Sequence, residues 1–394
     1  MKNKVRTKEP ILLRLLKPLI AFYTKVFLGF KYNYNFELDK NEKLVVLSNH
    51  QTDLDPVFVR VGLKRFFYIL STDNIYSKKL TSKFLTLMGG IPKRKGVPDF
   101  ESIKRILEIS KEGGSICIFP EGNRSYAEFQ FYIAPNFASL LLKMKATIVL
   151  YNIHGGFGSF PRFGAKRRKG PFYGEVKRIL RYEQYKDMSV DELTSIIKDN
   201  LRVFDSESGA LYKSNRRAEY LERMLFTCPK CGKLHTLESK GNYIKCNNCG
   251  LEVEYTEDLK LRSADKDFRY IRLVEWYDYQ KEVIRNMEIN EEVIFTDQDV
   301  ELAVVNPFKR YKVLAKGELK LYKDKFSVGD VILDVSNVMS ASPMSGRKLC
   351  ITYNGDNYQL KGNKRFNALK YAFIFHRLDT KMHRELLDNY YIID

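Results

Sequence analysis

Apolar and polar positions alternate in two different rhythms between residue 44 and about residue 180. Short apolar runs at 44–47, 66–70, 116–119 and 147–153 predict buried strands. Between them, apolar residues spaced by three and four predict helices over 100–111 and 137–145, the first ending at Gly113-Gly114. Strands that alternate with helices are typical of the α/β class. We therefore expect an α/β domain with a mixed sheet flanked by helices.

The N-terminal segment has a different pattern. Residues 11–30 contain 14 apolar residues, interrupted by Arg14, Lys17 and Lys25, and a membrane-spanning helix needs about 20 nearly uninterrupted apolar residues. Pro18 predicts a break or kink. Two interpretations remain: one or two amphipathic helices that lie in the membrane interface, or a core helix of a soluble domain. The basic character of this half of the chain favours the first.

Beyond residue 180 the pattern predicts a separate C-terminal organisation. Residues 189–224 are interpreted as polar helices, 263–287 and 367–378 as further helices, and the region between the last two as β-rich. Runs at 349–353 and 358–360 flank Asn354-Gly355-Asp356-Asn357, which indicates a hairpin. Short strands closed by one C-terminal helix resemble a pleckstrin-homology or GRAM-type module.

Length and charge divide the chain further. At about 150 residues per domain, 394 residues predict two or three domains. Residues 1–200 hold 35 Lys and Arg against 19 Asp and Glu, whereas residues 201–394 hold 32 against 29, so +16 of the net charge of +19 lies in the first half. That half is expected to meet an anionic partner, such as phosphate esters, an anionic membrane surface or nucleic acid. The expected regions are N-terminal interfacial helices at 1–35, an α/β domain at 36–215, a cysteine module at 222–258 and a β-rich domain with flanking helices at 262–394.

Four of the six cysteines form two C-x-x-C-G pairs. Cys228 and Cys231 are separated from Cys246 and Cys249 by 14 residues, a spacing that predicts a four-thiolate zinc ribbon in a reducing compartment. Because the protein would supply all four ligands, the zinc would be structural, and iron in a rubredoxin-like site is the alternative. The ribbon would be a rigid connector or a docking surface for a protein partner.

The stretch Ser48 to Pro56 follows a predicted strand and contains His50 and Asp55. Asp55 before Pro56 predicts a helix start with the aspartate as N-cap. A carboxylate bonded to Nδ1–H of the imidazole would leave Nε2 free to act as a base. The alternative is that both side chains only cap the helix.

Two further loops carry groups suited to an anion. Phe119 to Ser125 follows another strand and places Glu121, Gly122 and Arg124 at its carboxyl end, where ligands bind in open α/β sheets. Between the two motifs lies a glycine-flanked basic loop, residues 89–96, with Lys93, Arg94 and Lys95. Residues 162–181 add eight basic side chains and one acidic, which indicates a site for anionic headgroups or for the phosphates of a thioester carrier, or a solvated loop.

These motifs together resemble the glycerolipid acyltransferase family, in particular the 1-acyl-sn-glycerol-3-phosphate (lysophosphatidate) acyltransferases. The family's N-H-x4-D motif is matched by Asn49, His50 and Asp55, and its F-P-E-G-x-R-S motif by residues 119–125 with Asn123 in place of the usual Thr. The family's second motif places an Arg at a fixed distance after Gly-x-Ile, and here the basic residues Lys93, Arg94 and Lys95 come about one position early. No residue of this chain is assigned to the family's fourth motif. The resemblance covers roughly residues 10–200.

The resemblance implies an activity and roles. His50, oriented by Asp55, would deprotonate the sn-2 hydroxyl of 1-acyl-sn-glycerol-3-phosphate, which would take a fatty acyl group from acyl-CoA or an acyl carrier protein to give phosphatidate. The phosphate of the acceptor would be bound by Glu121, Gly122 and Arg124, with Arg94 and Lys93. No catalytic cofactor is implied, because the acyl thioester is a co-substrate. The site would work at the cytoplasmic face of the cell membrane, in a peripheral or monotopic protein.

Rival interpretations differ in class. The acceptor could be another lysophospholipid or glycerol-3-phosphate, and a non-catalytic lipid-binding membrane adaptor would need no turnover. A zinc-ribbon protein that binds nucleic acid would need a basic C-terminal half, and +3 over 194 residues argues against it. We therefore expect no nucleic-acid partner.

Overall fold

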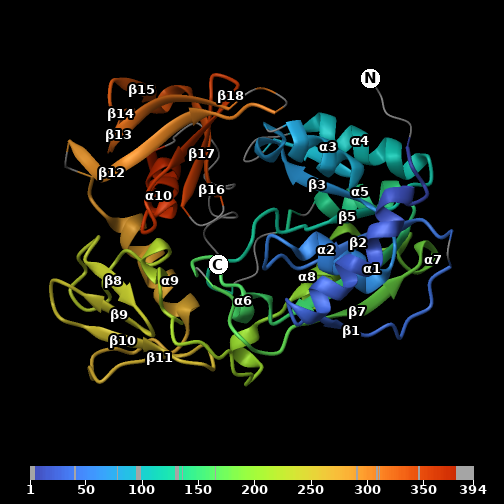
Figure 1. Ribbon diagram of the computed structural model, residues 1–394, viewed down its shortest axis with the longest axis horizontal. Helices are drawn as coiled ribbons and strands as arrows, with labels where there is room; N and C mark the ends of the chain where they lie inside the picture. Colours follow the sequence, from blue (N-terminus) through green and yellow to red (C-terminus); the bar gives the residue numbers. More distant parts are fainter. Residues whose placement is uncertain are drawn as a thin grey trace.

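The structure is a computed structural model of the full chain. The description covers residues 5–39, 41–77, 79–94, 99–128, 133–134, 136–164, 166–289, 292–307, 309, 311–344 and 347–378. Within these ranges the chain forms three sheets, and each is built from strands that are consecutive in the sequence and therefore similar in colour in Figure 1. Two have seven strands and the third has four.

The N-terminal region contains one helix, α1 (Ile11–Val26), within the one or two that the sequence predicted. Pro18 lies inside this helix and does not interrupt it, and the alternative of a kink stays a prediction. Lys17 lies beside Pro18 and donates to the carbonyl of Lys64 at 2.8 Å. None of the helices in the described ranges combines the length and the apolar character that a membrane crossing requires.

The first sheet has the order β1-β7-β6-β2-β5-β3-β4. Strands β6, β2, β5, β3 and β4 run parallel, whereas β7 is antiparallel to β6, so the sheet is mixed, as predicted. The strands are β1 (Lys31–Tyr32), β2 (Leu44–Ser48), β3 (Tyr68–Thr72), β4 (Gly90–Lys93), β5 (Ile116–Ile118), β6 (Thr147–His154) and β7 (Tyr173–Leu180).

Both faces of this sheet are covered. Alternate residues of β2 point into different cores, with Val45 and Leu47 in one and Leu44 and Val46 in the other. This two-sided burial explains why the strand is a continuous apolar run in the sequence. The helices around the sheet are α2 (Asp55–Leu63), α3 (Lys79–Leu87), α4 (Phe100–Lys111), α5 (Asn136–Met144), α6 (Gly156–Ser159), α7 (Tyr182–Tyr185) and α8 (Val190–Leu201).

Several sequence predictions in this region were wrong in detail. The strand predicted at 66–70 begins at Tyr68, and half of the predicted basic loop 89–96 is strand β4. Of the helices predicted at 189–224 only α8 forms, and the rest is irregular chain with short 3-10 turns η2 (Asp205–Glu207) and η3 (Leu221–Arg223). Strand β7 (YGEVKRIL) was missed because Glu175, Lys177 and Arg178 interrupt its apolar residues, so no continuous apolar run marks it.

The cysteine module forms the four-stranded antiparallel sheet β11-β10-β9-β8. Its strands are β8 (Leu237–Lys240), β9 (Tyr243–Cys246), β10 (Glu252–Tyr255) and β11 (Leu261–Arg262). Helix α9 (Leu273–Asn286) follows, about ten residues later than predicted, because residues 263–272 cross the module as irregular chain.

The C-terminal sheet has the order β15-β14-β13-β12-β18-β17-β16, and every pair in it is antiparallel. The predicted β-rich domain with a closing helix is therefore present, and its likeness to a pleckstrin-homology or GRAM-type module stays a prediction. The elements are β12 (Val293–Val304), β13 (Lys312–Tyr322), β14 (Lys325–Val328), β15 (Val331–Asp334), η4 (Val335–Asn337), β16 (Val338–Met344), β17 (Lys348–Tyr353), β18 (Asp356–Lys361) and α10 (Ala368–Leu378).

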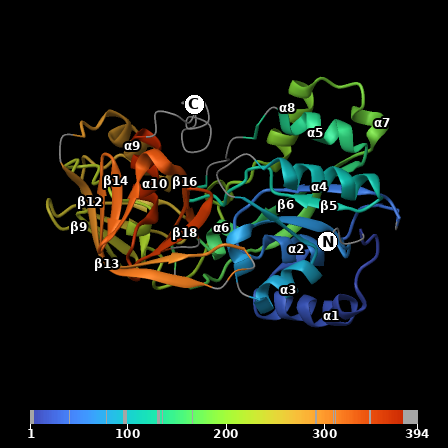
Figure 2. The same cartoon turned by 90° about the horizontal axis from the view of Figure 1, so that it is seen from above.

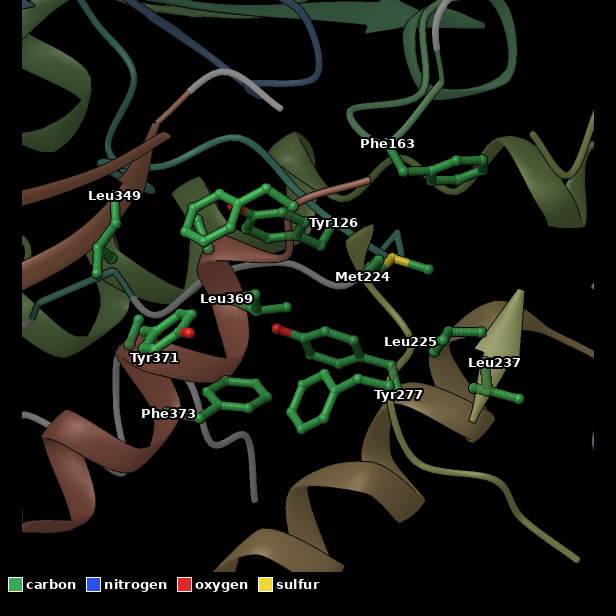
Figure 3. Close-up of a cluster of buried hydrophobic side chains, with 14 of the residues drawn as sticks. Tyr126, Phe163, Met224, Leu225, Leu237, Tyr277, Leu349, Leu369, Tyr371 and Phe373 are labelled. Carbon is green, nitrogen blue, oxygen red and sulfur yellow. The ribbon is translucent and has the colours of Figure 1, made fainter. Parts of the chain in front are cut away.

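One hydrophobic core joins these parts. Tyr126, Phe157 and Phe163 from the α/β half belong to the same buried cluster as the cysteine module, α9 and the C-terminal sheet. Figure 3 shows Tyr126 beside the side chains around α10, with Tyr277 of α9 near Phe373. The domain boundaries expected between the α/β half, the cysteine module and the β-rich domain therefore lie within a continuously packed region. The limits of the domains stay predictions.

Candidate active site

The loops that carry the sequence motifs meet at one edge of the first sheet. Strands β2, β5, β3 and β4 are parallel, so their carboxyl ends lie on the same side. His50 follows β2, Glu121 follows the neighbouring β5, and Lys93 ends β4, two positions beyond β5. The parallel order thus brings together residues about 70 positions apart.

His50 and Asp55 form a hydrogen-bonded pair. Nδ1 of His50 lies 2.8 Å from Oδ2 of Asp55, whose carboxyl group is completely buried. The prediction that Asp55 is the N-cap of α2 was wrong, because Leu54 holds that position and Asp55 is the first helical residue. Its carboxylate faces the preceding loop, where it accepts from the backbone N–H groups of Gln51 at 2.6 Å and Thr52 at 2.9 Å.

The remaining oxygen of Asp55 is also bonded. Oδ1 accepts from the hydroxyl of Thr52 at 2.5 Å. These donors fix the carboxylate in one orientation. An ionised carboxylate can only accept at Nδ1, so the imidazole carries its proton there and Nε2 is left as the basic nitrogen.

The F-P-E-G-x-R-S motif holds the backbone and the ring of His50. The N–H of His50 donates to Oε1 of Glu121 at 3.1 Å, and its carbonyl accepts from the N–H of Ser125 at 3.2 Å. The ring of Phe119 stacks on the imidazole with centroids 4.5 Å apart. Glu121 is 4% exposed and therefore positions His50 from inside the protein. Gly122 turns the chain here with φ of 65°, a conformation that favours glycine.

Sequence reasoning missed the residues that support the loop from β6. The amide of Asn49 bonds both the carbonyl and the N–H of Ile153, at 2.9 and 2.8 Å. Gln51 accepts from the N–H of Phe157 at 3.2 Å. The spacing of the N-H-x4-D motif contains Gln51 and Thr52, but only the fold shows what they contact.

Two buried carboxyl groups brace the turn at α6 behind this loop. Asp205 accepts from the N–H groups of Gly155 at 2.7 Å and Gly158 at 2.9 Å, and Glu128 accepts from the N–H of Ser206 at 3.0 Å. Burial, with the adjacent charge of Asp205, raises the pKa of Glu128 to about 8, and burial raises the pKa of Asp205 to about 6.

A cavity of about 390 Å³ opens beside the motif loops. Its lining includes Thr52, Asp53 and Leu54 of the N-H-x4-D motif and Arg124 of the F-P-E-G-x-R-S motif. Nη2 of Arg124 lies 3.1 Å from Oδ1 of Asp53, and the Arg124 side chain is only 11% exposed. A recessed guanidinium whose partner is a 68% exposed carboxylate suits an incoming anion.

Lys93 ends β4 and Arg94 follows it, at the same edge of the sheet. The N–H of Arg94 donates to Asp99, which caps α4, and the Arg94 side chain is exposed. Burial lowers the pKa of Lys93, and Asp99 opposes that shift. Lys95 lies outside the described residues.

The four cysteines form the second candidate site. The sulfur atoms of Cys228, Cys231, Cys246 and Cys249 all lie within 4.8 Å of one another, with Sγ–Sγ distances of 3.6 Å for Cys228–Cys249 and 3.8 Å for Cys231–Cys246. Tetrahedral coordination at a Zn–S distance of about 2.3 Å places sulfurs about 3.8 Å apart, so the four thiols fit such an ion.

The two cysteine pairs have the same backbone geometry. Gly232 and Gly250 donate to the carbonyls of Cys228 and Cys246 at 2.9 and 3.0 Å, and both glycines have positive φ. His235 is excluded from the sulfur group by its packing between Phe226 and Phe295. Burial lowers the pKa of His235 to about 3, with a further contribution from Lys370.

Comparison with known proteins agrees with this geometry. Residues 31–153 match the acyltransferase family model. Over 83 residues the chain is 32% identical to the chloroplastic 1-acyl-sn-glycerol-3-phosphate acyltransferase LPAT1 of Arabidopsis thaliana and 31% identical to the corresponding enzyme BAT2 of Brassica napus. Each match covers 21% of this chain and 23% or 24% of the relative, about a quarter of its length.

A solved structure is also similar. The 1-acyl-sn-glycerophosphate acyltransferase PlsC of Thermotoga maritima matches with a TM-score of 0.41 and 13% identity, over 48% of this chain and 79% of that one. Fold and motif loops define an α/β domain with a histidine–aspartate pair at the carboxyl edge of its sheet. Residues 31–153 are therefore similar to the acyltransferase family.

Proposed function

We propose that the protein transfers a fatty acyl group from an acyl thioester to the sn-2 hydroxyl of 1-acyl-sn-glycerol-3-phosphate and so forms phosphatidate. The observation that carries this proposal is the 2.8 Å contact between Nδ1 of His50 and a carboxylate that is buried and fully bonded. The names of the curated relatives support the choice of acceptor.

The His50–Asp55 pair suits direct transfer. Nε2 of His50 takes the proton of the acceptor hydroxyl as its oxygen attacks the thioester carbonyl. The new ester C–O bond forms and the C–S bond breaks, and the imidazolium gives its proton to the departing thiolate. Asp55 stabilises the imidazolium between these two transfers. General base catalysis of this kind contributes about 10²–10⁴-fold.

The acceptor phosphate has cationic partners close by. Arg124 lies in the loop whose Ser125 N–H bonds the His50 carbonyl, so the guanidinium and the imidazole are carried by adjoining loops. Glu121 and Gly122 shape this loop. Arg94 and Lys93 lie farther along the same edge of the sheet and add positive charge. We propose that they also contact the phosphate of the acceptor.

An apolar surface supports a site at the membrane. On α1 the side chains of Ile11, Leu15, Leu19 and Phe22 are 60–74% exposed, and Leu80 of α3 is 83% exposed. In Figure 2, α1 and α3 lie on the same side of the sheet, opposite α5 and α8. Such a face favours insertion into an anionic membrane surface, with the basic half of the chain toward the headgroups.

For the cysteine site we propose structural zinc. Four thiolates fill a tetrahedral shell and leave no position for a substrate. An ion there would stabilise the ribbon. It would take no part in the acyl transfer, for which we propose His50 and Asp55.

The deciding experiment is a thioester-release assay on detergent-solubilised protein with a panel of acceptors. We expect fastest release with lysophosphatidate, slower release with other lysophospholipids and glycerol-3-phosphate, and a loss of at least 100-fold in His50→Ala. The matched control is His154→Gln, a histidine on β6 that bonds Glu175 at 3.1 Å. Binding of phosphatidate without turnover by the wild type would contradict the proposal and favour the adaptor.

A further inference from the structure

The C-terminal sheet contacts the first sheet at the edge where the motif loops meet. Asn357, the second residue of β18, donates through Nδ2 to Oδ2 of Asp73 at 2.9 Å. Asp73 begins the 3-10 turn η1 (Asp73–Ser77) directly after β3, so it lies at the carboxyl end of that strand. Figure 1 shows β16, β17 and β18 on the side of their sheet that faces the α/β half. The C-terminal sheet is therefore docked at the carboxyl edge.

A second contact between the two sheets runs through Arg162, which follows α6. Its Nη2 donates to the carbonyl of Pro343 in β16 and its Nη1 to the carbonyl of Arg124, both at 2.8 Å. The guanidinium also lies over the ring of Tyr126, 3.7 Å from the centroid. Arg162 is 6% exposed, so these contacts hold it inside the protein. One side chain thus joins β16 to residues 124–126.

Residues 124–126 connect the anion site to the histidine. The side chain of Arg124 lines the cavity, and the N–H of Ser125 donates to the carbonyl of His50 at 3.2 Å. Arg162 contacts the residues on both sides of Ser125, through the carbonyl of Arg124 and the ring of Tyr126. Because a guanidinium is a rigid planar fork, the place of Arg162 determines the place of the Arg124 backbone.

The chain around Arg162 is itself held in place. The N–H of Gly164 donates to the carbonyl of Pro161 at 3.0 Å and closes a turn around the arginine. The next residue, Phe163, is 1% exposed and belongs to the core shared by both halves. Both terminal nitrogens of Arg162 are bonded to carbonyls. The side chain is therefore oriented toward the backbone that it joins.

We propose that Arg162 is a positioning residue, through which β16 of the C-terminal sheet fixes Arg124 for the phosphate of the acceptor. The inference rests on the proposed acyl transfer. It adds that the C-terminal half, which lies beyond the matched residues 31–153, takes part in acceptor recognition. Arg162 also lines the cavity, so direct contact with the phosphate is the alternative. A bridge needs the guanidinium fork, whereas an ion pair needs only the positive charge.

Arg162→Lys separates a bridge from a charge. Lysine keeps the positive charge but replaces the planar fork with one ammonium, which cannot hold both carbonyls in the same geometry. We expect KM for lysophosphatidate to rise about tenfold, equivalent to one lost charge-assisted contact. The kcat should stay within threefold of wild type, because Asp55 holds the imidazole independently. A KM equal to that of wild type would overturn the proposal.

The matched control is Arg60→Lys. Arg60 is also 6% exposed, and it bonds the carbonyls of Phe67 at 2.8 Å and Met88 at 2.7 Å. These carbonyls lie at the amino ends of β3 and β4, the sheet edge opposite the motif loops. Both variants should lower the temperature of unfolding by a similar amount, but only Arg162→Lys should change KM. Equal rises in KM would show a merely structural role and overturn the proposal.

The part played by the C-terminal sheet is tested from β18, two strands away from β16. Asn357→Ala removes the donor to Asp73 and so loosens the sheet at the carboxyl edge. We expect KM for lysophosphatidate to rise about threefold. The control is Gln298→Ala, which removes a 2.7 Å bond to Glu318 within the same sheet and should leave KM unchanged. An unchanged KM in Asn357→Ala would refute the part of the sheet in acceptor recognition.

Calorimetric titration with sn-glycerol-3-phosphate, which carries the phosphate of the acceptor without its acyl chain, provides a readout without turnover. Weaker binding in Arg162→Lys but not in Arg60→Lys supports the bridge, and equal or absent binding in both and in wild type overturns it. Turnover of lysophosphatidate with an unchanged KM in Arg162→Lys refutes the bridge and leaves the proposed function intact. A wild type that binds glycerol-3-phosphate but transfers no acyl group refutes the proposed function.

Discussion

The His50–Asp55 site and the four-cysteine site are assembled in different ways. The cysteine ligands span 22 residues, from Cys228 to Cys249, and their geometry follows from two local turns that repeat the same glycine conformation. The His50–Asp55 site joins residue 50 to residue 121 through neighbouring parallel strands. One site depends on local backbone conformation and the other on the order of strands in a sheet.

The two sites also differ in what they leave open. The four sulfurs face one another and would surround an ion completely. At the other site Asp55 is bonded to His50, Gln51 and Thr52 of the preceding loop, while the His50 side chain stays 21% exposed. A closed arrangement serves stability and an open one serves chemistry, so substitutions at the two sites should separate these properties.

The largest expected effect is that of Asp55→Asn on the rate of transfer. The amide cannot hold Nδ1–H of His50 and stabilise the imidazolium as a carboxylate does, so we expect kcat to fall by about 10²–10⁴-fold. Asp191→Asn, at an exposed position in the first turn of α8, should leave the rate unchanged. A kcat within threefold of wild type for Asp55→Asn would refute the role of the pair.

The next effect concerns stability. Cys231→Ser should lose the bound metal, measured as one ion per chain in the wild type, and lower the free energy of unfolding by several kcal/mol, a fraction of the about 10–16 kcal/mol of structural zinc sites. At temperatures where it remains folded, the variant should keep most of its kcat. Cys350→Ser, in β17, should retain the metal. Equal metal content in both variants would contradict the four-cysteine assignment.

A pH-dependent effect should come from Glu128. Its pKa is raised to about 8 by burial, above about 4.3 in the unfolded chain, so the folded state binds the extra proton between these values. The free energy of unfolding should therefore fall as pH rises from 6 to 8, on the order of 1 kcal/mol more in wild type than in Glu128→Gln. Denaturant unfolding at both pH values measures this difference, with the exposed Glu183→Gln as control. Parallel pH profiles for wild type and Glu128→Gln would show that Glu128 is already ionised at pH 6.

The smallest effect is expected from Thr52→Val. This variant removes the hydroxyl that donates to Oδ1 of Asp55 and leaves the backbone donors, a loss of about 1 kcal/mol. We expect kcat to fall about five- to tenfold, well below the effect of Asp55→Asn. Thr194→Val is the control, because its buried hydroxyl has no hydrogen-bond partner in the described part of the chain. A loss as large as that of Asp55→Asn would mean that the hydroxyl, rather than the carboxylate, controls the imidazole.

The difference between a locally determined site and one that depends on strand order explains which parts of the structure could be predicted from the sequence. The cysteine group was predicted completely because its determinants are local, and β2 was predicted because burial on both faces leaves a continuous apolar run. Strand β7 has only two buried residues, Gly174 and Leu180, within a basic segment, and its place beside β6 depends on the rest of the sheet. Motif spacing predicted His50 near Asp55, but not that Asp55 faces backward to Gln51 and Thr52.

Other parts of the site could not be predicted because they depend on distant packing. The contact of Asn49 with Ile153 joins residues 104 positions apart, and Glu128 and Asp205 meet through the turn at α6. The cavity combines residues from the motif loops with Arg223 near the cysteine module. No local signal in the sequence marks these partners.

The hydrophobic cluster that runs from Tyr126 through the cysteine module to α10 has a consequence for the behaviour of the whole chain. A fragment cut near residue 215 would expose Phe157 and Phe163 to water and should precipitate rather than work as a small enzyme. Heating should likewise melt both halves in a single cooperative step, so loss of the metal from the ribbon should lower the melting temperature of the α/β half as well.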